Sequence, residues 1–237
     1  MKPVLIRQHE EMTPPGLLVD WLRERGIPYE VQASYKRAAV PNPRDYAFVA
    51  SLGSPHGPND THEPSVVEEL ELIEAAVEQE VPVLGLCFGG EALSAVLGGR
   101  VERAPKPELG WREIETEDPA AIPPGPWLEW HYERFTTPPG AAELARTSDA
   151  VQAFRFGPHL AVQFHPESTV EIVSYWASTD SKRLAELGID DWRALVDASR
   201  ERQEASRAAA FRLFEAFAAG VEAHHDANQG GDAGGKE

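Results

Sequence analysis

Hydrophobic positions in the first half of the chain alternate between short apolar runs and segments with helical spacing. The segment VLIRQH near the start has the short apolar pattern of a strand. Residues 16–25 then place leucines and a tryptophan at helical spacing and end before Gly26, a residue type that commonly terminates helices. Residues 29–33 and 45–52 return to the extended pattern. This order predicts alternating strands and helices.

The next segments predict a complete strand, helix, strand unit beside the only cysteine. Residues 63–80 carry apolar side chains at steps of four, three and four, with acids on the opposite face: Val66, Leu70, Ile73 and Val77. Residues 81–86 form a near-continuous apolar run, and residues 89–97 again have helical spacing. Such a run is typical of a parallel sheet covered on both faces, so Cys87 is predicted at a strand-to-helix turn.

Beyond residue 100 the pattern changes. Residues 100–116 and 127–167 contain short extended runs separated by proline and glycine, which predicts antiparallel strands flanking the parallel core. Residues 168–177 resume helical spacing. The remaining apolar positions outline a helical appendage whose phenylalanine stripe is expected to pack on the core: Trp192, Leu195, Val196, Phe211, Phe214, Phe217 and Val221. The last segment, NQGGDAGGKE, has no periodicity and is predicted to be disordered.

Together these segments predict an α/β fold with a mixed, mainly parallel central sheet flanked by helices. The 237 residues exceed a usual domain, which favours one domain with an appendage. We expect the domain at residues 1–180, a C-terminal helical extension at 181–226 and a disordered tail at 227–237.

Composition narrows the choice of partners. A formal net charge of −17 repels polyanions, which argues against nucleic acid and anionic membranes as partners. The apolar stretches are shorter than the roughly 18 to 20 residues of a membrane span. The opening MKPVLIRQHEE lacks the apolar core of a signal peptide, so a cytoplasmic location is expected. One cysteine excludes an internal disulfide and a metal site built from several thiolates.

The sequence around that cysteine has the pattern of a nucleophile elbow. Gly85 and Gly89 lie two residues either side of Cys87, where a strand meets a helix. The glycines let neighbouring backbone approach, and the helix N-terminus favours a thiolate. Downstream, His165 and Glu167 flank a proline, a spacing in which the carboxylate can orient an imidazole base. A lone cysteine is more often a buried small hydrophobe, but the elbow and the histidine together favour a catalytic thiol.

GLCFGGE together with QFHPE resembles the class I glutamine amidotransferase domain, and the resemblance spans residues 3 to about 178. It includes LGSP, similar to the family's oxyanion loop, as well as ELGW and WHYERF. Within the family the chain is most similar to stand-alone relatives of the GMP synthetase amidotransferase domain. The resemblance implies a flavodoxin-like fold and no metal or organic cofactor. It also implies that Cys87 is the nucleophile, His165 the general base and acid, and Glu167 the residue that orients it.

The resemblance implies two oxyanion donors, the backbone N–H of Phe88 and that of the loop residue before Pro55, in the Gly53–Ser54 segment. Ser54 stands where the family usually has glycine, which keeps the N–H but narrows the accessible φ and ψ. Glu91 stands where glutamine is usual. An ionised Glu91 lacks amide donors and adds negative charge, so it could bind the α-ammonium of a glutamyl substrate or select another γ-glutamyl compound.

The sequence leaves open the roles of three further histidines and one tyrosine. His131 and Tyr132 lie where members of the family contact the substrate, although His131 is equally well read as part of an aromatic cluster. His56 and His62 lie in a proline-rich loop and are expected to be solvated, with adventitious metal binding as the alternative.

Three functions are therefore considered. The first is an amidotransferase subunit that releases ammonia from glutamine for a separate synthase. The second is a stand-alone γ-glutamyl hydrolase or peptidase with the same triad, acting on a γ-glutamyl amine or peptide. The third is a catalytically inactive binding or regulatory protein, for which the substitutions at Ser54 and Glu91 are the motivation.

Overall fold

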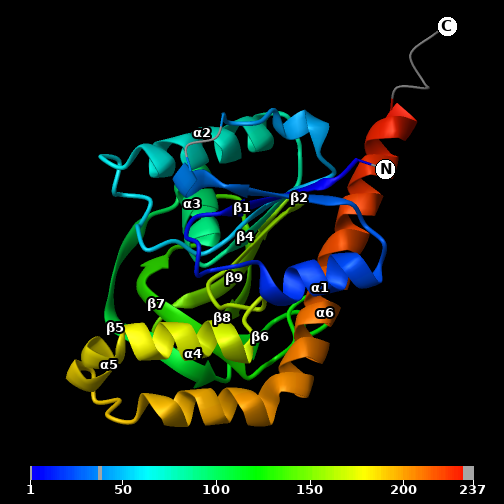
Figure 1. Ribbon diagram of the computed structural model, residues 1–237. Coiled ribbons are helices and arrows are strands. Elements are labelled where there is room, and N and C mark those ends of the chain that lie inside the picture. Colours follow the sequence, from blue (N-terminus) through cyan, green and yellow to red (C-terminus); the bar gives the residue numbers. More distant parts are fainter. Residues whose placement is uncertain (1, 37–38, 232–237) are drawn as a thin grey trace, which may run out of the picture.

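The computed structural model describes residues 2–36 and 39–231. An eight-stranded sheet forms its centre, in the order β2-β1-β3-β4-β10-β9-β8-β6 (Figure 1). The first five strands in this order are mutually parallel: β2 (Tyr29–Ala33), β1 (Val4–Gln8), β3 (Val49–Ser51), β4 (Val83–Leu86) and β10 (His159–Val162). The other three are antiparallel: β9 (Val151–Phe156), β8 (Ala142–Arg146) and β6 (Glu115–Thr116). This is the mixed, mainly parallel sheet that the sequence predicts.

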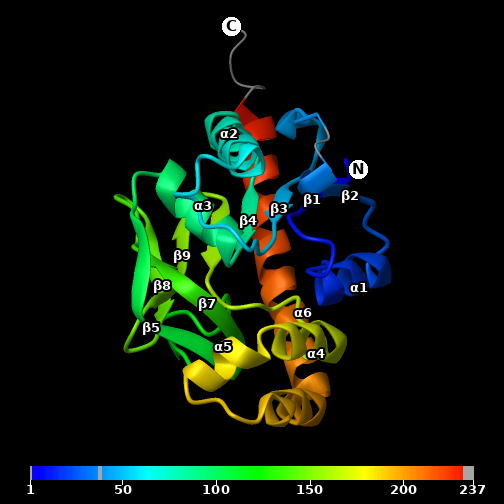
Figure 2. The same cartoon turned by 60° about the vertical axis from the view of Figure 1, so that its left-hand side comes forward.

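Helices cover both faces of this sheet, which explains why its central strands β3, β4 and β10 are buried at every position. On β1, Val4 and Ile6 pack in one core with α1 (Gly16–Glu24) and α6 (Trp192–Gly231). Leu5, between them, points to the other core, with α2 (Pro64–Glu78) and α3 (Phe88–Val96). Figure 2 shows α2 and α3 on one side of the sheet, and α1 and α6 on the other.

The strand predicted over residues 45–52 is shorter in the structure. Strand β3 comprises only Val49–Ser51, because Pro43–Asp45 form a 3₁₀ turn. Backbone hydrogen bonds to the β1 segment nevertheless begin earlier, since the N–H of Ala47 donates to the carbonyl of Pro3 and the N–H of Leu5 donates to the carbonyl of Phe48. Tyr46 and Phe48 are both buried.

The strand prediction for residues 100–116 also needs correction. The segment contains the two-residue strand β6 of the main sheet and one twelve-residue strand, β5 (Val101–Arg112), which pairs with β7 (Trp127–Phe135) in a separate two-stranded sheet. The register shifts between Arg103 and Glu108. The prolines at positions 105 and 107 fall in this irregular stretch, where no ladder hydrogen bond is required of them.

The C-terminal region is helical, as expected. After α4 (Val170–Thr179) and the short α5 (Ser181–Glu186), α6 packs against α4 and then α1. The phenylalanine stripe does join the core: Phe214, Phe217 and Val221 are buried there and Phe211 is partly buried. Helix α6 continues to Gly231, so residues 227–231 are helical rather than disordered; the rest of the predicted tail, 232–237, lies outside the described residues.

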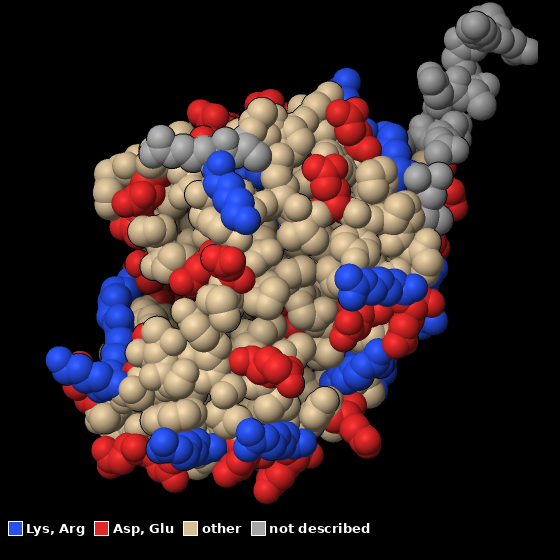
Figure 3. Space-filling view, in the orientation of Figure 1, with Lys and Arg blue, Asp and Glu red and all other residues tan. Residues whose placement is uncertain are grey.

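Charged side chains of both signs are interleaved on the surface over the first part of α6, along the lower edge of Figure 3. An example is the pair of Arg200 and Asp197, whose Nη1 and Oδ1 atoms are 2.7 Å apart. Such exposed pairs contribute about 0 to 1 kcal/mol each, so the apolar stripe is the main attachment of this helix. In the described part of the chain, no helix combines the length and apolar character needed to cross a bilayer.

Candidate active site

Cys87 lies in a strained turn between β4 and α3. Its φ of 50° and ψ of −109° lie outside the regions that side-chain-bearing residues favour, at a typical cost of about 1 to 3 kcal/mol. The neighbouring glycines are needed for close approach: a Cβ on Gly85 would lie 2.5 Å from the carbonyl carbon of Gly89, and one on Gly89 would lie 2.2 Å from the backbone oxygen of Ser51. The turn therefore has the geometry of a nucleophile elbow.

The sheet brings His165 beside this turn. Strands β4 and β10 are parallel neighbours with Leu86 paired to Val162, so the residues that follow each strand emerge at the same edge. The N–H of Cys87 donates to the carbonyl of Val162 over 2.9 Å and fixes the two strand ends together. Gly53, in the loop after β3, lies close to both residues. A Cβ placed there would lie 3.1 Å from Cε1 of His165 and 3.9 Å from Cβ of Cys87.

Glu167 holds the imidazole of His165. Nδ1 of His165 and Oε1 of Glu167 are 2.7 Å apart, and both side chains are buried. Burial lowers the pKa of His165, but the neighbouring Glu167 and Cys87 more than offset this effect, and the pKa is raised well above its ordinary value. Within the described part of the chain, Nε2 of His165 has no hydrogen-bond partner. Both His165 and Cys87 line the same cleft.

Two backbone segments, at Phe88 and at Ser54, flank the thiol of Cys87. Phe88 is the first residue of α3, and the N–H groups of a first helical turn have no acceptor within the helix. Ser54 follows Gly53 in the loop after β3 and lines the cleft with Cys87. Positive φ values among the described non-glycine residues occur only at Glu80 and Cys87, so Ser54 adopts a conformation that serine tolerates. The replacement of glycine at this position therefore causes no left-handed strain.

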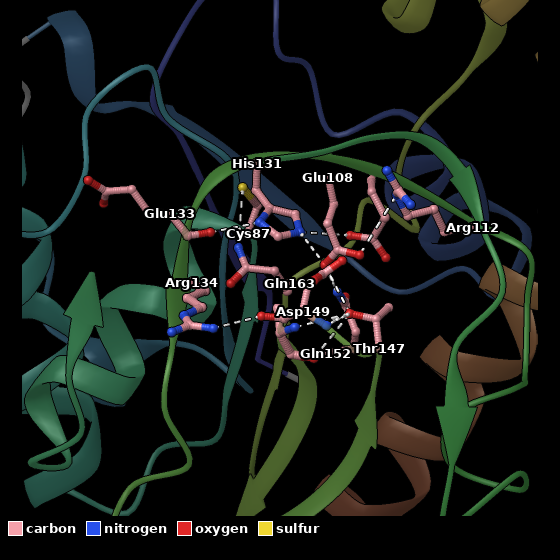
Figure 4. Close-up of polar contacts among 12 residues, drawn as sticks. Cys87, Glu108, Arg112, His131, Glu133, Arg134, Thr147, Asp149, Gln152 and Gln163 are labelled. Atoms are coloured by element: carbon pink, nitrogen blue, oxygen red, sulfur yellow. Dashed lines mark hydrogen bonds and ion pairs between the residues drawn. The ribbon is translucent and has the colours of Figure 1, made fainter. Parts of the chain in front are cut away.

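Glu91 is buried one turn into α3. Nε2 of Gln163, the residue after β10, donates to its Oε1 over 2.9 Å. The same nitrogen lies 4.0 Å from Sγ of Cys87 (Figure 4). Burial raises the pKa of Glu91 to about 7, because this single hydrogen bond only partly replaces water. The carboxyl thus carries a fractional charge near neutral pH.

A buried cluster of two carboxylates and one imidazole adjoins Glu91. Nε2 of His131 lies 3.3 Å from Oε2 of both Glu108 and Glu129. Its Nδ1 donates to the carbonyl of Glu133 over 2.7 Å (Figure 4). Burial opposes protonation of His131, yet the two carboxylates raise its pKa to about 10. His131 is therefore a buried cation in an acidic cluster, not a member of an aromatic one.

The cleft at Cys87 has two lobes. The first lobe, with a volume of about 310 Å³, includes His165; the second, of about 290 Å³, includes Glu91 and His131. Both lobes are bordered by six residues: Ser54, Pro55, Cys87, Trp130, Tyr132 and Arg183. Tyr132 lies at this border beneath Arg183, whose guanidinium carbon is 3.7 Å from the ring centroid.

Sequence reasoning missed several residues of the site. Gln163 was a weak but available signal, since it is a polar residue in the apolar strand segment HLAVQF. Glu129 likewise interrupts the apolar WLEWHY. Trp176 and Arg183 belong to helices that follow the motif, and nothing local marks them as part of the cleft. His62 is exposed, whereas His56 is half-buried and lines the second lobe of the cleft. The described residues contain no group of three or more His, Cys, Asp or Glu suited to a metal ion.

Comparison with known proteins decides the family. The sequence profile described as "Glutamine amidotransferase class-I" matches residues 17–172. This chain belongs to the class-I glutamine amidotransferase family. The solved structure of a glutamine amido transferase from Methylobacillus flagellatus superimposes with a TM-score of 0.84 and 28% identity, covering 93% of this chain and 95% of that one. A glutamine amidotransferase from Thermotoga maritima gives 0.82 and 26%, covering 91% and 97%.

Curated relatives match this amidotransferase chain over part of their length. A GMP synthase from Aeropyrum pernix is 37% identical over half of this chain, and the match covers 23% of its own length. One subunit of a GMP synthase from Ignicoccus hospitalis is 33% identical over 44% of this chain, and the match covers 60% of its length. The chain thus spans less than two thirds of the length of either relative.

Proposed function

We propose that the protein hydrolyses the γ-amide of glutamine to glutamate and ammonia through a thioester on Cys87. The observation that carries this proposal is the arrangement of His165 between the buried carboxylate of Glu167 and the elbow that presents Cys87. The raised pKa of His165 favours an imidazolium beside a thiolate, which is the form in which cysteine attacks a carbonyl.

In the acylation step, Sγ of Cys87 bonds to the γ-carbonyl carbon. The carbonyl oxygen takes up the negative charge, which the N–H groups of Phe88 and Ser54 would stabilise. The tetrahedral intermediate then expels the nitrogen, which takes its proton from Nε2 of His165 and leaves as ammonia. Water attacks the thioester with His165 as base, releasing glutamate and restoring the thiol.

Glu91, His131 and Tyr132 are proposed to bind the rest of the substrate. Glu91 and His131 line the second lobe of the cleft, and Tyr132 lies at its border with the first. A carboxylate at position 91 attracts an α-ammonium group, and the imidazolium of His131 offsets the negative charge nearby.

The ammonia acceptor is proposed to be a separate synthase subunit. The similarity to a protein named as one subunit of a GMP synthase supports an arrangement of separate chains. The alternative of an inactive binding protein rests only on the substitutions at Ser54 and Glu91, and the ordinary φ of Ser54 weakens it.

Glutamate release from glutamine tests the proposal. Cys87→Ala should abolish turnover. Glu167→Gln should reduce kcat by up to about 10⁴-fold, the loss typical when a triad carboxylate becomes an amide, while still allowing the thioester to form. An exposed control, His62→Gln, should match the wild type because this side chain is 75% exposed. Activity in Cys87→Ala equal to that of the wild type would overturn the proposal.

A further inference from the structure

The two lobes of the cleft give the two halves of a γ-glutamyl substrate different surroundings. His165 lines the first lobe, whereas Phe88 and Glu91 line the second, and Cys87 borders both. The proton donor to the leaving group must lie on the leaving-group side of the attacked carbon. The first lobe is therefore where the departing amine lies, and the glutamyl portion extends into the second.

The first lobe is far larger than the leaving group of glutamine requires. Ammonia is close in size to water, which occupies about 30 Å³ in the liquid. The lobe measures about 310 Å³, within the range of small-molecule sites, about 300 to 1,000 Å³. A site that released only ammonia would need no such volume next to its proton donor.

Aromatic side chains line this volume. The rings of His165 and Trp176 meet edge to face at 4.8 Å between centroids, and Trp130 lies 5.7 Å from Trp176. Tyr132 and Tyr175 complete the lining. Flat apolar walls of this kind bind a planar ring by offset or edge-to-face contact.

Polar and charged side chains share the lining of the lobe with these rings. Oδ2 of Asp180 accepts a hydrogen bond from Nε1 of Trp130 over 3.4 Å, and this fixes the indole plane. Glu10 is the second carboxylate of the lobe, and the guanidinium of Arg183 lies over Tyr132. Two cations, Arg183 and the imidazolium of His165, balance the two carboxylates, so the lobe carries no net charge and suits an uncharged leaving group.

We propose that this protein also hydrolyses γ-glutamyl amides of arylalkylamines, with the aryl ring in the first lobe between Trp130, Trp176 and Tyr175. The proposal rests on the proposed function, since it uses the same thiol and imidazole. Sγ of Cys87 bonds to the γ-carbonyl carbon, the amide C–N bond breaks, and the amine leaves with a proton from His165. Water then cleaves the thioester, so one amide and one water give glutamate and one free arylalkylamine.

The test compares kcat/KM for three substrates: γ-glutamyl-phenethylamide, γ-glutamyl-ethylamide and glutamine. The two amides differ only in the ring. Burying that ring should raise kcat/KM for the phenethylamide above that for the ethylamide by about tenfold or more. In Tyr175→Ala this ratio should fall at least about threefold. In Tyr35→Ala, a tyrosine outside the cleft, it should stay at the wild-type value, with thermal unfolding of both variants as the check on folding.

The outcomes separate the two proposals. Hydrolysis of glutamine with the phenethylamide cleaved no faster than the ethylamide overturns the arylalkylamine proposal and leaves the glutaminase proposal standing. A ratio unchanged by Tyr175→Ala in a folded variant overturns the placement of the ring. No cleavage of any of the three substrates overturns the proposed function itself, and this proposal with it.

Discussion

Two buried histidines near the thiol respond to burial in opposite ways. His9 follows β1, with Nδ1 2.8 Å from Oγ of Ser34 and Nε2 3.2 Å from Oγ of Ser51. Burial lowers its pKa to about 4. His131, equally buried, has its Nε2 3.3 Å from two carboxylates, and its pKa is raised to about 10.

The difference lies in the partners and not in the depth of burial. Glu69 is 3.7 Å from His9, but this carboxylate already pairs with Arg7 over 2.7 Å, and the guanidinium disfavours a second cation. His9 is thus a neutral group that packs edge-on against Phe88, with ring centroids 4.9 Å apart. His9 therefore packs against the residue that follows Cys87, whereas His131 places a positive charge beside Glu91.

Removing the His131 cation should have the strongest consequence. Neither carboxylate oxygen of Glu129 has a hydrogen-bond partner among the described residues, so His131→Leu removes the ion pair that links this buried carboxyl to the imidazole. Breaking a buried pair in this way typically costs about 3 to 5 kcal/mol. Urea unfolding at pH 7 measures the loss. A loss under about 1 kcal/mol would mean that no imidazolium links the two carboxylates.

The pH dependence of stability should reveal His9. Its folded-state pKa of about 4 lies below the ordinary value of 6.5, so the unfolded chain binds its proton more tightly. This contribution to stability is therefore complete above pH 6.5 and falls by about 3 kcal/mol as the pH drops to 4. In His9→Gln, the stability difference between pH 7 and pH 4 should shrink by about this amount. If the stability difference between pH 7 and pH 4 were the same in His9→Gln as in the wild type, His9 would be protonated in the folded protein.

Glu91 should also make stability depend on pH, with a smaller effect than His9 and the opposite sign. Its folded pKa of about 7 lies above the ordinary 4.5, so the contribution is complete below pH 4.5 and is lost as the pH rises through 7. Glu91→Gln keeps the acceptor for Gln163 and removes the charge. The variant should gain about 2 kcal/mol relative to the wild type between pH 4 and pH 6. A variant whose stability tracks the wild type over this range would place an ionised Glu91 in the folded state at pH 4.

The sequence could predict the elbow but not the acidic cluster. The spacing of glycines around Cys87 is local, and so is the pairing of His165 with Glu167, so both are visible in one dimension. The cluster depends on the register of β5 and β7, which places Glu108 opposite His131. Periodicity does not specify a register across a bulge. The prolines in β5 also divided the predicted strand into short runs.

The fold likewise divides into features that local sequence predicts and features that it does not. Continuous apolar runs predicted the parallel strands because both faces of the sheet are covered. The apolar run over residues 45–52 predicted burial correctly but overstated the length of the strand, since periodicity reports which side chains leave water rather than where a strand begins. The extension of α6 to Gly231 contradicts a prediction from composition alone.

Labelling with a chloroketone analogue of glutamine, read by peptide mass analysis, asks most directly whether Cys87 is the nucleophile of a glutamine site. We expect one label per chain, on Cys87, with activity lost in proportion and with glutamine protecting against both. Glutamate release that persists in fully labelled protein, or a label that glutamine does not displace, would contradict that role.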